Sequence, residues 1–230
     1  MHEFFAESAT AGVVLSFLAY YVGLQINKRF KLAILNPLLI AMALVIVFLL
    51  AFDIDYETYN SSARYLSYLL TPATVSLAIP MYQKLELLKK EPAAIFCGIL
   101  SGVLTSLLSI LILSALFGLS HEQYVTLLPK SITTAIGMGV SEELGGMAVI
   151  TTASIIITGI FGNIAADALW KLFHITEPIA KGISIGTAAH AFGTAKALEI
   201  GETEGAMSSL SIVVSGLCTV VLANIFAGFM

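Results

Sequence analysis

Two groups of basic and hydroxyl side chains lie inside apolar stretches of this sequence. The first group follows Pro129 and consists of Lys130, Ser131, Thr133 and Thr134. The second group lies in the segment GTAAHAFGTAK (186–196) and consists of Thr187, His190, Thr194 and Lys196. Hydroxyl groups and a cation together can hydrogen-bond an anion and neutralise its charge. The sequence therefore predicts that these two groups form a binding site for a small anion.

The first group belongs to a segment that occurs twice. The stretch PATVSLAIPM (72–81) is identical at four of ten positions to PKSITTAIGM (129–138), at an offset of 57 residues. At the same offset, a third copy begins at Gly186. Proline or glycine with hydroxyl groups in an apolar stretch is typical of a broken membrane helix that lines a polar site. The first copy therefore adds three candidate site residues, namely Pro72, Thr74 and Ser76.

Ionisable groups inside these stretches have two interpretations. A charged side chain at membrane depth costs several kcal/mol unless it faces protein or water, so Lys130 and His190 are candidates for function. The alternatives are that Lys130 and Lys196 extend to an interface and that His190 is a packing residue. Because the ordinary pKa of histidine lies near physiological pH, His190 is also a candidate for proton coupling.

Four further polar residues are candidates for a coupling site. Glu142 and Glu143 precede the pair Gly145-Gly146, and the alternative is that both acids are solvated in a loop. Asn163 and Asp167 lie one helical turn apart near the end of an apolar run. Both pairs are therefore candidates for proton or cation coupling.

The elements that position these residues follow from composition. Hydrophobic residues make up 58% of the 230 residues, charged residues 11%, and the mean hydropathy is +0.94. An ordinary globular domain has about 25% charged residues, so this composition predicts an all-α integral membrane protein. No basic face suggests nucleic acid, and no nucleophile, metal or cofactor pattern suggests an enzyme.

Apolar runs predict about eight membrane segments. They cover 8–26, 34–52, 63–82, 92–117, 123–145, 147–170, 179–199 and 205–229. The loops at 27–31 and 83–91 hold six of the eleven Lys and Arg residues, and the loop at 53–57 between them holds none. Basic loops face the cytoplasm, so this pattern predicts that the N-terminus lies outside.

The repeat groups these segments into units at about 63–117, 123–172 and 179–229. Each unit has an interrupted segment followed by a smooth helix that carries Ser101-Gly102, Thr158-Gly159 or Ser215-Gly216. We expect these small residues to serve helix packing. If 123–145 and 179–199 both cross the membrane, successive units point the same way; if each dips in and returns, the units are inverted. The sequence leaves this choice open.

Three stretches carry a family resemblance that covers nearly the whole chain. The stretches PKSITTAIGMGVSEELGG (129–146), ITGIFGN (157–163) and GISIGTAAHAFGTAKALEIGETEGAMSSL (182–210) resemble the LrgB/CidB family of bacterial membrane proteins. Plant relatives of that family carry glycolate and glycerate across the chloroplast envelope. The family pattern often has a second proline after the threonine pair, where this chain has Ala135. That departure predicts a less sharply broken helix at the second interruption.

The resemblance implies a single domain (1–230) that carries small monocarboxylates such as glycolate, glycerate or pyruvate across the bacterial cytoplasmic membrane. It also implies a smaller LrgA/CidA-type membrane partner and no cofactor. The alternative is an antiholin-like regulator of murein hydrolase export and autolysis. Short loops and small-residue helices add the expectation of a homodimer.

Overall fold

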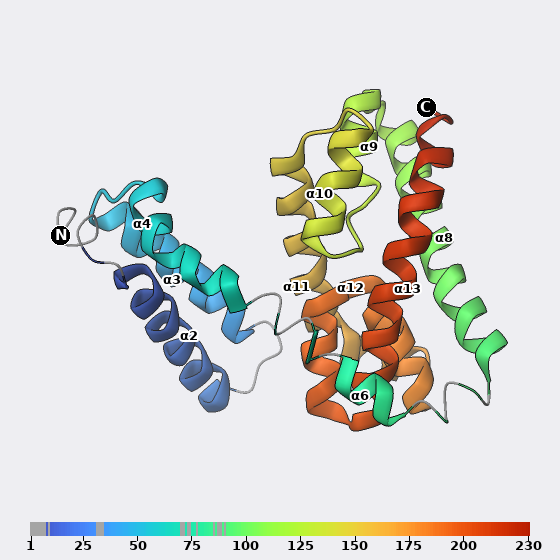
Figure 1. Ribbon diagram of the computed structural model, residues 1–230, viewed down its shortest axis with the longest axis horizontal. Helices are drawn as coiled ribbons and strands as arrows, with labels where there is room; N and C mark the ends of the chain where they lie inside the picture. The colour runs from blue at the N-terminus through green and yellow to red at the C-terminus, as the bar shows by residue number, and fades with distance from the viewer. Residues whose placement is uncertain are drawn as a thin grey trace. The chain divides into compact units, whose positions relative to one another are not determined.

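The computed structural model describes residues 8, 10–30, 35–69, 72, 75–76, 78–84, 86, 89 and 91–230, and every regular element within them is helical. The chain forms two compact units, Met1–Ser76 and Leu77–Met230 (Figure 1). Among the described residues, three helices are long and apolar enough to cross a membrane, at Pro92–Phe117, Ala148–Leu172 and Glu202–Ala227. The composition's prediction of a helical membrane protein is thus confirmed, but these three helices confirm only part of the eight predicted segments.

The first unit contains α2 (Ala11–Phe30), α3 (Pro37–Ala51), α4 (Tyr56–Ala63) and the 3-10 helix η1 (Arg64–Leu69). Asn36 begins α3 because its side chain accepts a hydrogen bond from the Leu38 amide at 2.9 Å. The hydroxyl groups of Ser16 and Tyr59 lie 2.7 Å apart and join α2 to α4. Of the first copy's candidates, Pro72 and Ser76 lie in this unit, whereas Thr74 lies outside the described residues.

The second unit contains the two later copies of the repeat. Its helices are α6 (Ala78–Gln83), α8 (Pro92–Phe117), α9 (His121–Leu127), α10 (Thr134–Glu143), α11 (Ala148–Leu172), α12 (Pro178–Ile200) and α13 (Glu202–Ala227). The helix α8 ends at Gly118, which has the positive φ of 64° that favours glycine. The helix α9 then begins with a capping box formed by Ser120 and Gln123.

The interrupted segment at 123–145 reverses direction. It consists of α9, a turn at 128–133 that contains the buried Pro129, and α10. In α9, the Tyr124 hydroxyl donates to the Phe226 carbonyl at 2.9 Å, near the end of α13. The hydroxyl of Thr126 accepts from the Met147 amide at 2.9 Å, just after α10. The segment therefore enters and leaves at the same end of the unit, which we call the α9 end.

The interrupted segment at 179–199 also reverses. The helix α12 is broken at His190, whose φ of 41° and ψ of −129° are not helical. Before the break, Gly186 packs against the backbone of Ser208 in α13. After the break, the Thr194 hydroxyl lies 2.7 Å from the Ser208 hydroxyl. Both arms of α12 thus lie beside the first turns of α13. This end of the unit lies opposite the α9 end, and we call it the α12 end.

The two repeat units of the second unit are consequently inverted. At the start of α11, the Thr151 hydroxyl donates to the Thr126 carbonyl of α9 at 2.8 Å. At its end, the Trp170 indole donates to the Ser184 hydroxyl of α12 at 3.0 Å. The helix α11 therefore runs from the α9 end to the α12 end, and α13 runs the opposite way (Figure 1). Of the two arrangements left open by the sequence, the contacts match the inverted one, because the segments at 123–145 and 179–199 each reverse and return to the end where they begin. We call these two hairpins the re-entrant segments.

Small residues on the smooth helices face the re-entrant segments. A Cβ atom at Gly102 would lie 2.6 Å from the Thr187 methyl group, and one at Gly159 would lie 2.8 Å from the His190 ring. At Gly216 the neighbour is Ile136 of α10, at 3.2 Å. Small side chains allow this close approach, as the packing interpretation of the repeated glycines predicted.

Candidate functional site

A large cavity in the second unit has a volume of about 990 Å³. It lies between α8, the turn at 128–133, α11 and the first arm of α12. Glu91 and Glu177, which directly precede α8 and α12, line it at the α12 end. Lys130 and Ser131 line it at the re-entrant turn. The cavity therefore leads from two acidic side chains at one end of the unit to a cation at the turn.

Lys130 is the one Lys or Arg among the described residues that line this cavity. Its side chain is half-buried, and its ammonium group donates to the Ser131 hydroxyl at 3.2 Å. The Ser131 hydroxyl also lies 3.1 Å from the hydroxyl of Ser106 in α8. These contacts place the cation at the tip of the re-entrant segment, beside two hydroxyl groups that can also bind an anion.

The cavity contains hydroxyl groups that the sequence analysis did not select. Besides Ser131 and Thr187, the hydroxyl-bearing residues that line it are Ser101, Thr105, Ser106, Ser109, Thr158 and Ser184. Ser101, Thr105 and Ser109 recur every four residues, so they share one face of α8. That spacing is visible in the sequence and could have marked α8 as a cavity-lining helix.

Several predicted site residues lie away from the large cavity. Thr133 and Thr134 begin α10 and are half-buried, and the Thr133 side chain makes no capping hydrogen bond. Glu142 and Glu143 are exposed at the last turn of α10. Pro72 and Ser76 belong to the first unit and are exposed there. The structure thus brings Lys130, Ser131 and Thr187 together around the cavity.

His190 occupies the hinge of α12 rather than the cavity wall. The residue is 2% exposed, and its Nε2 atom lies 3.1 Å from the Ile155 carbonyl oxygen of α11. A carbonyl oxygen only accepts, so this hydrogen bond requires a proton on Nε2. The ring also meets Phe192 edge to face, with ring centroids 5.6 Å apart. The backbone carbonyl of His190 accepts from the Thr194 hydroxyl at 3.0 Å. These contacts of His190 and Thr194 stabilise the reversal of α12.

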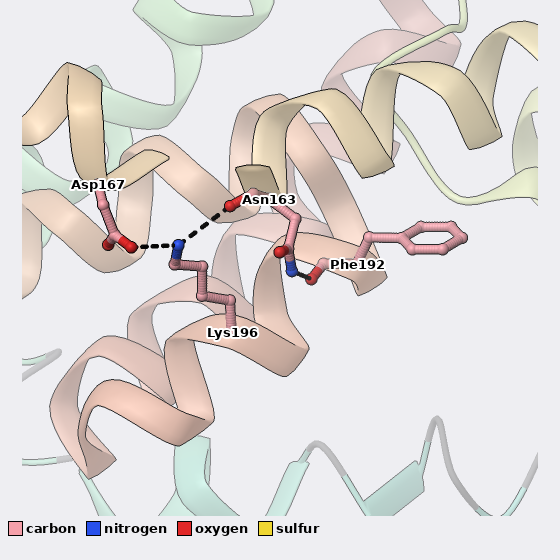
Figure 2. A network of polar contacts seen from close by, with 4 residues as sticks. All are labelled: Asn163, Asp167, Phe192 and Lys196. Atoms are coloured by element: carbon pink, nitrogen blue, oxygen red, sulfur yellow. Dashed lines mark hydrogen bonds and ion pairs between the residues drawn. The ribbon is translucent and has the colours of Figure 1, made fainter. Parts of the chain in front are cut away.

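Asn163, Asp167 and Lys196 form a polar network between α11 and the second arm of α12 (Figure 2). The Lys196 ammonium group lies 2.6 Å from a carboxylate oxygen of Asp167 and donates to the Asn163 carbonyl at 3.1 Å. The Asn163 side-chain amide donates to the Phe192 carbonyl at 2.8 Å. The candidate coupling residues Asn163 and Asp167 therefore contact Lys196, a pairing that their separation in the sequence did not reveal.

Comparison with known proteins identifies the family. The model of the LrgB-like family matches residues 16–229. The chain belongs to the LrgB-like family. The family resemblance carried by the stretches at 129–146, 157–163 and 182–210 is thereby confirmed.

Curated relatives in the family cover nearly the whole chain. The holin-like protein CidB of Staphylococcus epidermidis is 38% identical over 210 residues, which are 91% of this chain and 92% of the relative. The antiholin-like protein LrgB of Bacillus cereus is 36% identical over 219 residues, 95% of each chain. No solved structure matches the chain significantly.

Proposed function

We propose that this protein is a secondary transporter of small monocarboxylates such as glycolate, glycerate or pyruvate. The observation that carries the proposal is the large cavity, with the Lys130 ammonium group at the tip of a re-entrant segment. A solvated anion loses its hydration when it enters such a site, and a cation with hydroxyl donors replaces those interactions. The substrate carboxylate is expected to bind Lys130 and Ser131, with Ser106 as a further donor.

The inverted repeat supports the transport proposal. Transporters of several folds bind substrate near the middle of the membrane, between broken helices related by inverted repeats. Here the α9–α10 hairpin and the broken helix α12 enter from opposite ends of the unit, and residues of both line the cavity. Movement of one hairpin against the other would expose this site to each side in turn.

Uptake of radiolabelled glycolate or pyruvate into proteoliposomes tests the proposal. Lys130→Ala is expected to abolish uptake, and Lys130→Met, which keeps most of the side-chain volume, is expected to do the same. Lys171→Ala is the matched control, because Lys171 is exposed in the last turn of α11 and does not line the cavity. Size-exclusion profiles establish that each variant is assembled. Normal uptake by both Lys130 variants would remove this residue from the site.

The second candidate function is that of a holin-like or antiholin-like protein that regulates murein hydrolase export and autolysis. The names of the relatives favour it over transport, since both describe holin-like or antiholin-like proteins. Proteoliposomes that contain the chain alone, or with an LrgA/CidA-type partner, distinguish the two functions. Saturable uptake supports transport, whereas release of an encapsulated neutral dye without carboxylate uptake supports the holin-related function.

The remaining features of the proposal concern placement and coupling. We expect the protein to lie in the bacterial cytoplasmic membrane with its N-terminus outside, as a homodimer that also associates with an LrgA/CidA-type protein. Proton coupling through His190 would act on the hinge, because His190 does not line the large cavity. His190→Gln is then expected to flatten the pH dependence of uptake. An unchanged pH profile would exclude His190 from coupling.

A further inference from the structure

A second, smaller cavity shares Ser106, Ser131 and Thr187 with the lining of the large one. Its volume is about 10 Å³, and it is enclosed by α8, the turn at 128–133, the first arm of α12 and α13. Nine of the described residues line it, and five of these carry hydroxyl groups: Ser106, Ser131, Thr187, Ser215 and Thr219. Polar side chains from four separate elements therefore converge on a space of about the size that one water molecule needs.

The hydroxyl of Thr187 has no hydrogen-bond partner within the described residues, although its oxygen is inaccessible to solvent. The residue is 6% exposed, and its methyl group faces Gly102 of α8. Buried hydroxyl groups in native proteins nearly always have a partner, either protein or ordered water. A ligand in the small cavity would supply the partner that Thr187 lacks.

The chemistry of the lining indicates a neutral ligand. Among the residues that the structure describes, no carboxylate lines the small cavity, and the Lys130 ammonium group donates to Ser131 at its edge. A cation in this space would be repelled by Lys130 without a compensating negative charge. Hydroxyl groups both donate and accept, as does water. We infer that the small cavity binds one water molecule, which hydrogen-bonds Thr187 to the turn at 128–133 and to α13.

This water joins both re-entrant segments to the helices around them. Ser131 belongs to the first re-entrant segment, Thr187 to the second, and Ser215 and Thr219 to α13. The inference goes beyond the proposed function, because it concerns the assembly of the two segments whether or not a carboxylate is transported. Thr187 then acts as a positioning residue through the water.

The sign of the stability change in Thr187→Val tests the inference. If water satisfies the hydroxyl, the substitution removes a hydrogen bond and is expected to lower Tm by about 2–4 °C. If the hydroxyl is unsatisfied, its replacement by a methyl group of similar shape removes a buried polar atom and raises Tm. Thr152→Val is the matched control, because the Thr152 hydroxyl bonds the Ala148 carbonyl within α11 and lines neither cavity.

A double variant and a direct observation complete the test. Thr219→Val should destabilise through the same water, so the decrease in Tm for the double variant with Thr187→Val is expected to be smaller than the sum of the single decreases. A density peak for water should appear between Thr187 and Thr219 in a high-resolution cryo-EM map of the wild type. A raised Tm for Thr187→Val, or an empty cavity in that map, would overturn the inference. A third result would also overturn it: a Tm of the wild type that is higher in NaCl than in choline chloride, with no such difference in Thr187→Val. That result would show that the small cavity binds a sodium ion.

Discussion

The ammonium nitrogen of Lys196 lies 2.6 Å from a carboxylate oxygen of Asp167, and this ion pair joins the second arm of α12 to α11 (Figure 2). Twenty-nine residues separate the two in the sequence. The Lys196 side chain is 14% exposed, whereas that of Asp167 is 54% exposed. Leaving a mostly buried ammonium group without partners costs free energy. The contacts of Lys196 therefore stabilise the position of the second arm of α12 on α11.

Lys196→Met is expected to lower the free energy of unfolding by about 1.5–3 kcal/mol, since hydrogen bonds to charged groups contribute about this much. Asp167→Asn should cost less than about 1 kcal/mol, because the carboxylate is half-exposed. Thermal unfolding in detergent measures both changes. Equal and negligible effects of the two substitutions would show that the arm is held by packing alone.

Gly186→Ala is expected to lower the free energy of unfolding by about 1–3 kcal/mol, the usual cost of overpacking. The added Cβ atom would lie 2.5 Å from the carbonyl oxygen and 2.7 Å from the Cα atom of Ser208, and backbone atoms cannot move aside cheaply.

Gly139→Ala is the matched control for Gly186→Ala. A Cβ atom at Gly139 meets no atom of the described part of the chain within 4 Å, and alanine is favoured over glycine in a helix interior by about 0.5–1 kcal/mol. The control is therefore expected to stabilise α10 slightly. A Gly186→Ala variant as stable as the control would contradict the close packing of α12 on α13.

His190→Ala is expected to be less stable than His190→Gly by about 1 kcal/mol or more, because a side chain at positive φ carries a steric cost that glycine lacks. Both variants lose the hydrogen bond to Ile155 and the contact with Phe192, so they differ chiefly in backbone strain. The usual preference of a helix interior is the reverse. Chemical unfolding of the two variants measures the difference, and an alanine variant that equals or exceeds the glycine variant would contradict the reversal at His190.

Ser106→Ala is expected to weaken carboxylate binding by about 5–10-fold, which corresponds to the loss of one hydrogen bond of roughly 1 kcal/mol. This prediction depends on the proposed transport function. Ser114→Ala is the control, because Ser114 is buried in the same helix without lining either cavity. Titration calorimetry with pyruvate measures the affinity. Equal affinities for the two variants would place the carboxylate elsewhere.

The class of the protein and the positions of its helix breaks could be predicted from composition and repetition. A mean hydropathy of +0.94 places most of the chain in lipid, where backbone groups must be paired within helices. Pro129 interrupts one helix because proline cannot donate a backbone hydrogen bond. The 57-residue offset then predicted a break near Gly186, and the observed break lies at His190 in the same segment.

The direction of the chain after each break could not be predicted from these patterns. A broken helix can continue or reverse, and the choice depends on which distant helices pack against its two arms. Gly186 and Thr194 both contact Ser208, which requires a reversal between them. The apolar pattern of each arm is the same in either arrangement.

The sequence alone thus predicts the membrane class, the repeat and the candidate cation Lys130, because hydropathy and helix breaks are properties of short segments. The inverted arrangement and the partner of Lys196 were settled by contacts between segments far apart in the chain. Such contacts depend on the packing of whole helices, which no short segment encodes.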